Sequence, residues 1–116
     1  MQVEKLKYII WAQDLNRAIN FYATVFDAEI ERQSEVMAEL SVAGTLIGIH
    51  GGGEGKRTWT GMSFQIKDLF EGCRVLKDSG GIVIRPPEDT PEEPAHRAMC
   101  VDSEGNEIML TKKRDT

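Results

Sequence analysis

The stretch VDSEGNEIML, Val101 to Leu110, combines a turn with a strand of alternating character. The residues from Asp102 to Asn106 are typical of turns, and the residues after them alternate between two faces. Ile108 and Leu110 make one face apolar, whereas the other face is mixed and includes Met109. The stretch therefore predicts a hairpin, and it raises the question of whether Met109 belongs to a chemical site.

The same order of elements is expected twice along the chain, as strand, helix and three strands. Each helix follows an aspartate that suits the N-cap position, and the second helix ends at a pair of glycines. The expected strands are residues 3–12, 28–33, 36–43, 46–50, 59–68, 82–87, 95–102 and 106–112, and the expected helices are residues 14–26 and 68–81. The matching features of the two halves are Asp14 and Asp68, Gly44 and Gly105, Ile47 and Ile108, and Ile49 and Leu110.

Length and composition favour one soluble domain. The chain has 116 residues, 41% of them hydrophobic, and a formal net charge of -5. The charge gives no reason to expect a nucleic-acid partner, and no segment suits a membrane span or a signal peptide. Cys73 and Cys100 show no metal-binding spacing, so we expect reduced, structural thiols in a cytoplasmic protein.

The helix start DLNRAINFY, residues 14–22, and the ending DSEGNEIML, residues 102–110, resemble the vicinal oxygen chelate superfamily. This superfamily is also named for glyoxalase, bleomycin resistance proteins and dioxygenases, and the resemblance covers essentially the whole chain. It implies an α+β fold of two βαβββ modules, whose curved sheets surround a cleft. We expect one domain, residues 1–116, with modules at 1–53 and 58–116 and a glycine-rich link between them; the modules could pair within one chain or across two.

The resemblance also implies where a divalent metal would bind in the metal enzymes of the superfamily. Its ligands lie on the first and last strands of each module, at Lys7, Gly48, Gly61 and Met109 in this chain. Such a metal requires histidine nitrogens or carboxylate oxygens, and none of these four residues supplies them. We therefore predict a member with no metal ligands, no cofactor and no assigned catalytic residue.

Strand alternation gives the residues that would face the cleft. They form a mixed surface of aromatic, sulfur-containing and polar side chains, with glycines leaving room at the centre, as in a pocket for a small molecule. The expected ligand-binding residues are Lys7, Trp11, Gly48, His50, Trp59, Gly61, Ser63, Gln65, Met99, Glu107 and Met109. The alternative is that Trp11, Met99 and Met109 simply fill a closed core.

Two further arrangements would give this surface a chemical role. Lys7 could act as a base or form a Schiff base, or its ammonium could instead simply form an ion pair with Glu39 or Glu107. His50 and His96, with one of the two glutamates, would make a displaced metal site.

These observations lead to three hypotheses of function. The first is a metal-independent small-molecule binding protein, a homodimer resembling the bleomycin-resistance branch, which acts by sequestration. The second is a glyoxalase-like lyase or isomerase with a displaced metal or a metal-free site. The third is an interaction module that regulates a partner protein, for which an exposed apolar patch is required.

Overall fold

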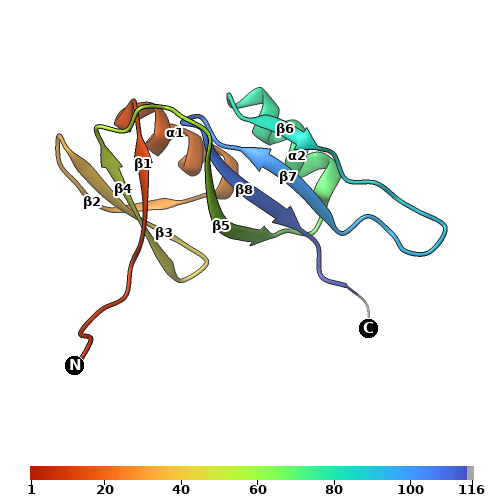
Figure 1. Ribbon diagram of the computed structural model, residues 1–116, viewed down its shortest axis with the longest axis horizontal. Helices are drawn as coiled ribbons and strands as arrows, with labels where there is room; N and C mark the ends of the chain where they lie inside the picture. The colour runs from red at the N-terminus through yellow and green to blue at the C-terminus, as the bar shows by residue number, and fades with distance from the viewer. Residues whose placement is uncertain (115–116) are drawn as a thin grey trace.

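The computed structural model describes residues 1–114 and contains two four-stranded sheets and two helices (Figure 1). The first sheet has the order β1-β4-β3-β2, and the second has the order β5-β8-β7-β6. Its strands are β1 (Tyr8–Ala12), β2 (Glu29–Gln33), β3 (Met37–Val42), β4 (Thr45–Gly51), β5 (Thr58–Gln65), β6 (Ile82–Arg85), β7 (Arg97–Val101) and β8 (Asn106–Thr111). The helices are α1 (Leu15–Phe26) and α2 (Leu69–Asp78).

The two sheets are built in the same way, which confirms the predicted repeat of βαβββ. In each sheet the first strand pairs in parallel with the last, and the remaining pairs are antiparallel. The expected elements are all present, although the first strand begins at Tyr8 and not at Val3. Residues 115–116, which belong to the expected second module, lie outside the described residues.

Both helices begin at the predicted aspartates. The Asp14 carboxylate accepts the backbone N–H of Arg17, and the Asp68 carboxylate accepts the backbone N–H of Glu71. The two caps have nearly the same backbone angles, with φ of -123° and -126° and ψ of 103° in both. A capping carboxylate satisfies a helical N–H that has no partner inside the helix, so the sequence fixes both helix starts locally.

The helices cover one face of each sheet, and the apolar residues of the strands alternate onto that face. Ile49 and Leu110 are fully buried there, as is Tyr22 of α1. The core extends across both sheets, because Phe26 of α1 stacks on Phe64 of β5 with ring centroids 3.9 Å apart. Tyr8 alternates onto the same side as the buried Ile10 but remains 40% exposed, because it lies at the beginning of an edge strand.

The turn at residues 102–106 joins the two sheets through buried polar groups. The Tyr22 hydroxyl donates to Asp102 at 2.6 Å, and the Asn106 side chain donates to the backbone oxygen of Trp11 at 2.9 Å. Burial, and then the charge of Asp102, raise the pKa of Tyr22 well above its usual value, so the phenol stays protonated and donates. The opening stretch of the sequence therefore connects the modules as well as forming a hairpin.

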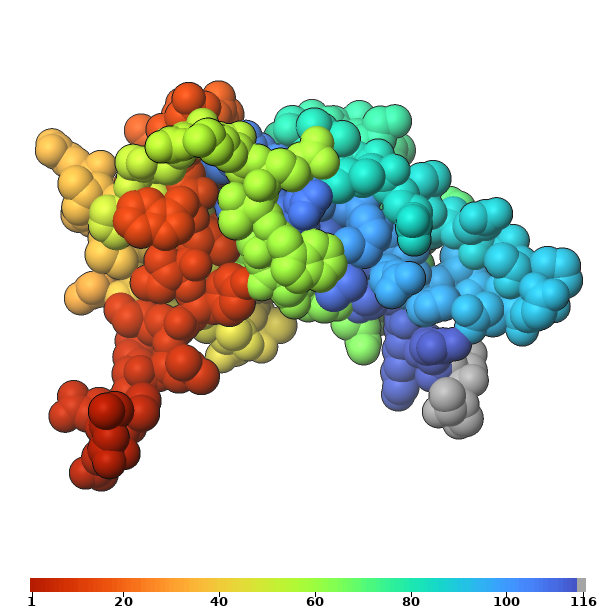
Figure 2. Space-filling model, viewed as in Figure 1, coloured from red at the N-terminus to blue at the C-terminus, as the bar shows by residue number. Residues whose placement is uncertain are grey.

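The opposite face of each sheet carries no helix, and we call it the open face. In Figure 1 the two sheets lie side by side toward the viewer, with both helices behind them. Figure 2 shows that the β1 and β5 segments, red and yellow-green, are neighbours on this surface. The molecule measures 48 × 34 × 22 Å, so the open faces extend along its two longer axes. Among residues 1–114, no helix has the length and apolar character needed to cross a membrane.

Candidate functional site

Strand pairing arranges the open face of the first sheet in rows. One row contains Arg32 of β2, Glu39 of β3, Gly48 of β4 and Ile9 of β1, each opposite the next. The neighbouring row is Met37, His50 and Trp11, again in register. The Trp11 and His50 rings are in contact, with centroids 4.5 Å apart. Trp11 is 53% exposed, which rejects the alternative that it fills a closed core.

A buried carboxylate lies at the centre of this face. The Glu39 side chain is 6% exposed and forms ion pairs with Lys7 at 3.1 Å, Arg32 at 2.9 Å and Lys5 at 3.8 Å. The hydrogen bond from Lys7 is the main reason that the pKa of Glu39 lies below its usual range, despite the opposing effect of burial. Lys7 therefore has the carboxylate partner that the sequence offered as one of two alternatives, and the cluster contains three cations around one anion.

The two glycines at the expected metal positions differ from each other. At Gly48, an added Cβ would lie 3.1 Å from the terminal methyl of Ile9, so Ile9 already covers the space that was expected to be empty. Gly61 lies between Trp59 and Ser63, where the pairing of β5 with β8 shifts, and its φ is +76°. Nothing lies within 4 Å of an added Cβ at Gly61, so that position is open, but a side chain there would be strained.

The open face of the second sheet brings together most of the remaining predicted residues. Trp59 lies opposite Glu107, and Met109 lies between Ser63 and Met99. Gln65 pairs with Thr111, whose hydroxyl is 3.1 Å from that of Ser63. Arg57 contacts Glu107 at 3.6 Å.

The predicted residues of the two sheets meet where β1 and β5 are neighbours. Trp11 and Trp59, which is 59% exposed, line one hollow of about 360 Å³ together with the glycine-rich segment 52–55. Two contacts show that this segment packs closely on the rest of the molecule. The Gly53 N–H donates to the backbone oxygen of Ala12 at 2.9 Å, and an added Cβ at Gly105 would lie 2.6 Å from the backbone oxygen of Gly55. It is therefore part of the wall of the hollow.

The residues at the expected metal positions do not fit a divalent metal. Lys7 offers an ammonium already bound to Glu39, Gly48 has no side-chain donor and is covered by Ile9, and Gly61 has no side-chain donor either. Met109 offers only a thioether sulfur, which is a poor ligand for hard cations. These four residues therefore give a divalent metal no suitable ligand, and the ammonium of Lys7 repels it.

The displaced metal site proposed as an alternative is not assembled within the described chain. His50 Nδ1 is 2.7 Å from the backbone oxygen of Gly51, and His96 is instead 3.6 Å from Glu93. Among residues 1–114, no three histidine, cysteine or acidic side chains are grouped so that they could hold a metal. Burial raises the pKa of Cys73. Burial, and then the neighbouring Cys73, raise the pKa of Cys100 to about 12. Both thiols are therefore inert at neutral pH.

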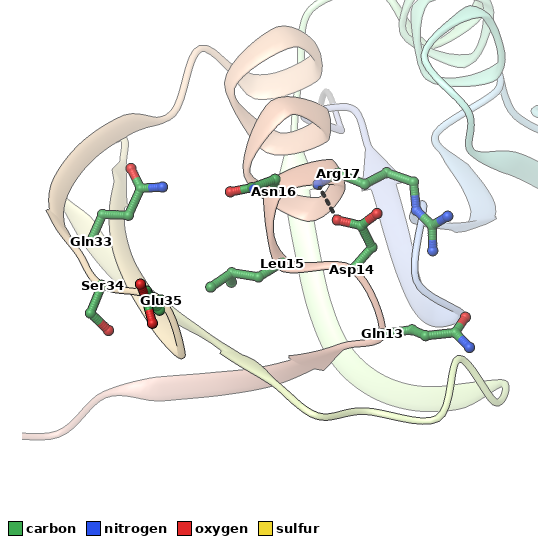
Figure 3. Close-up of a pocket in the computed structure, with 8 residues that line it drawn as sticks. All are labelled: Gln13, Asp14, Leu15, Asn16, Arg17, Gln33, Ser34 and Glu35. Carbon is green, nitrogen blue, oxygen red and sulfur yellow. Dashed lines mark hydrogen bonds between the residues drawn. The ribbon is translucent and has the colours of Figure 1, made fainter.

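A larger hollow lies away from the open faces, beside the start of α1 (Figure 3). It measures about 830 Å³ and is lined by polar side chains that include Asp14, Arg17 and Gln33. Asp14 caps its own helix, as the dashed line in Figure 3 shows, and Arg17 is bound to Glu104. Asp14 and Arg17 are thus already used within the chain, and the remaining charged side chain of the lining, Glu35, is exposed.

Sequence reasoning missed the residues that surround Lys7. Arg32 and Lys5 were not considered, and Glu39 was named only as a partner or a ligand of other groups. The available signal was a single carboxylate in the apolar stretch MAELSV, since a charge in a central strand requires a partner.

The sequence and the fold were compared with known protein families and with solved structures. The family model described as Glyoxalase/Bleomycin resistance protein/Dioxygenase superfamily matches residues 5–110. The fosfomycin resistance protein FosX from Listeria monocytogenes, in its hexagonal form, is 20% identical with a TM-score of 0.79, over 98% of this chain and 96% of that chain. A mutant of that protein complexed with Mn(II) and 1S,2S-dihydroxypropylphosphonic acid is 23% identical with a TM-score of 0.76, over 95% of this chain and 90% of that chain.

A glyoxalase/bleomycin resistance protein/dioxygenase family enzyme from Burkholderia phytofirmans PsJN is 17% identical with a TM-score of 0.75, over 91% of this chain and 95% of that chain. At these identities the structural likeness shows the fold alone. A comparison with curated proteins gives no match.

Proposed function

Because the chain belongs to the glyoxalase/bleomycin resistance protein/dioxygenase superfamily, we propose that it binds a small molecule on its open faces without a metal ion. Its action would then be sequestration, as in bleomycin-resistance-type proteins. The proposal treats residues 1–116 as one domain with modules at 1–53 and 58–116. The two buried thiols suit the reducing environment of the cytoplasm, where we place the protein.

The observation that carries this proposal is the ion pair between Lys7 and Glu39. Lys7 stands at the first expected metal position, and its ammonium puts a fixed positive charge where the metal enzymes of the superfamily hold an ion. A metal at this position would face an ammonium 3.1 Å from the buried carboxylate of Glu39, and the repulsion would disfavour binding.

The exposed tryptophans support a binding role. Trp11 and Trp59 are more than half exposed and line the same hollow, where their faces are available to a planar group. One structural relative was solved with a small phosphonic acid, which shows that a fold of this kind holds a small molecule in that protein.

We further propose that the protein is a homodimer in which the open faces are partly covered by a second copy. Large apolar side chains are exposed on or beside these faces, and such groups favour burial in an interface. They are Ile9, Trp11, Trp59, Ile82 and Ile84. The alternative of a glyoxalase-like lyase or isomerase has no support from the described residues, since Lys7 is paired and the two histidines lie in separate surroundings.

Native mass spectrometry of freshly purified protein, followed by ligand screening with tryptophan fluorescence, tests the proposal. We expect a metal-free dimer and a change in fluorescence with at least one class of small molecule. The variants Trp11→Phe and Trp59→Phe serve as matched controls, because each removes one reporter and should reduce the signal from its own side of the hollow.

A stoichiometric divalent metal in the native spectrum would overturn the proposal. It would also be overturned if no compound in a chemically diverse panel changed the tryptophan fluorescence. An assay of methylglyoxal-glutathione conversion with added nickel or zinc addresses the enzyme alternative directly. We expect no turnover above that of buffer with the same metal.

A further inference from the structure

We propose that the open face of the first sheet recognises a small organic anion, with an oxyanion held by Lys7 and Arg32 and a planar or apolar group held against Trp11. This inference rests on the proposed function and names the class of ligand. It also reverses the simplest expectation from the net charge of -5, which favours cationic ligands.

The cations around Glu39 keep donors that the carboxylate does not use. The Lys7 ammonium has three N–H groups, one of which bonds to Glu39, and the Lys7 side chain is 30% exposed. Arg32 contacts Glu39 through one terminal nitrogen and has further N–H groups in its planar fork. Glu39, almost fully buried, holds both cations in place, so the cost of ordering them for an anion is reduced before binding.

The local charge favours an anion although the whole chain is acidic. Lys5, Lys7 and Arg32 lie within 4.0 Å of Glu39, which leaves a surplus of positive charge at this point of the face. Exposed charges beyond about 8 Å are largely screened at physiological salt, so the local cluster dominates over the overall charge. The edge strand also carries acidic side chains, and that of Glu31 accepts a hydrogen bond from the hydroxyl of Ser41 at 2.8 Å.

The spacing along β1 sets the size of the ligand. Ile9 lies in the row of Glu39, and Trp11 lies in the next row, so the cationic, aliphatic and aromatic side chains follow one another along the face. The two rows are roughly 7 Å apart along the strands, and Glu39 on β3 lies two strands, roughly 10 Å, from Trp11 on β1, so their backbone positions are roughly 12 Å apart. The side chains shorten this distance, because the Lys7 ammonium bonds to Glu39 and the Trp11 ring contacts His50 on the strand between them. An aromatic ring joined to a carboxylate by a short chain fits this distance, and Ile9 supplies an apolar floor between the two ends.

Three probes of the same shape and different charge test the inference: 3-phenylpropionate, 3-phenylpropionamide and 3-phenylpropylamine in its ammonium form. Binding is measured from the fluorescence of Trp11 in the Trp59→Phe protein, at physiological salt and at pH 7. We expect the carboxylate to bind at least tenfold more tightly than the amide and the ammonium compound to bind most weakly. Added salt should weaken the binding of the carboxylate more than that of the amide.

Charge-removing variants locate the site. Lys7→Met should bring the affinity for the carboxylate down to that for the amide, and Arg32→Gln, on the edge strand, should reduce it without affecting the buried end of the cluster. Lys67→Met is the matched control, because it removes the same charge from an exposed position between β5 and α2. It should leave the affinity within twofold of the parent protein.

Equal or tighter binding of the amide or the ammonium compound would overturn this inference while leaving a metal-free binding protein in place. An equal loss in Lys7→Met and Lys67→Met would also overturn it, since only the total charge would then matter. Failure of all three probes counts against it as well. Failure of the proposed function is distinguishable, because it appears as a bound divalent metal in the native mass spectrum or as no response to any compound of the chemically diverse panel.

Discussion

Glu104 is the residue on which the first module depends most directly. Its side chain has no exposed surface and accepts hydrogen bonds from Arg17, from the backbone N–H of Asp14 and from Ser103. Burial alone would raise the pKa of Glu104, but these hydrogen bonds outweigh it and hold the pKa below its usual range. A carboxylate from the second module therefore anchors the start of α1.

We predict that Glu104→Gln lowers the free energy of unfolding at pH 7 by about 2 kcal/mol, because charge-assisted hydrogen bonds are lost. The folded pKa is depressed, so the contribution of Glu104 is complete above about pH 4.3, the pKa in the unfolded chain, and is lost as the pH falls through the lower folded pKa. Urea unfolding at a series of pH values should thus show the difference between the two proteins shrinking in acid. A constant difference across this range would contradict the argument.

At the same scale, the sequence identified residues whose role is local and missed those whose role depends on register. Asp14 and Asp68 could be predicted because a capping carboxylate acts within three residues of its own position. The contact of Arg32 with Glu39 could not, because a bulge in β2 between Ile30 and Arg32 decides which residue lies opposite Glu39.

Among the elements, the equivalent turns of the two modules offer a matched pair. Gly44 and Gly105, which occupy matching positions in the predicted repeat, both have positive φ, +80° and +93°. An added Cβ at Gly44 meets nothing within 4 Å, whereas at Gly105 it would lie 2.6 Å from the Gly55 oxygen and 2.7 Å from the Lys56 oxygen. The second turn is thus packed against the segment that links the sheets.

We predict that Gly44→Ala costs about 1 kcal/mol of stability, from backbone strain alone. Gly105→Ala should cost about 2–4 kcal/mol, because the link must also move away from the turn. Thermal and urea unfolding of the two variants side by side measures the difference. Equal losses would mean that the link yields freely and does not pack as a fixed wall of the hollow.

The positions of elements followed from periodicity, but their exposure did not. Phe21 is 2% exposed, because α1 packs on β3 and β4 of its own sheet and also contacts α2 of the other module. Tyr8 shares the helix side of β1 with the buried Ile10 and yet is exposed, because no strand lies beyond β1 in its sheet. Alternation along one strand contains no information on what lies beside it.

For the whole molecule, the contacts between the modules predict a single cooperative unfolding transition. Trp11 lies in the first sheet and Trp59 in the second, so each variant with one tryptophan, Trp59→Phe or Trp11→Phe, reports on its own module. The shared core and the hydrogen bond from Tyr22 to Asp102 couple the two sheets, so the urea midpoints of the two proteins should coincide at equal concentration.

Tyr22→Phe, which removes one buried hydrogen bond worth about 1 kcal/mol, should lower both midpoints together. If the Trp59 fluorescence reported unfolding at a lower urea concentration than the Trp11 fluorescence, the second module would unfold alone. The turn at residues 102–106 would then not couple it to the first module.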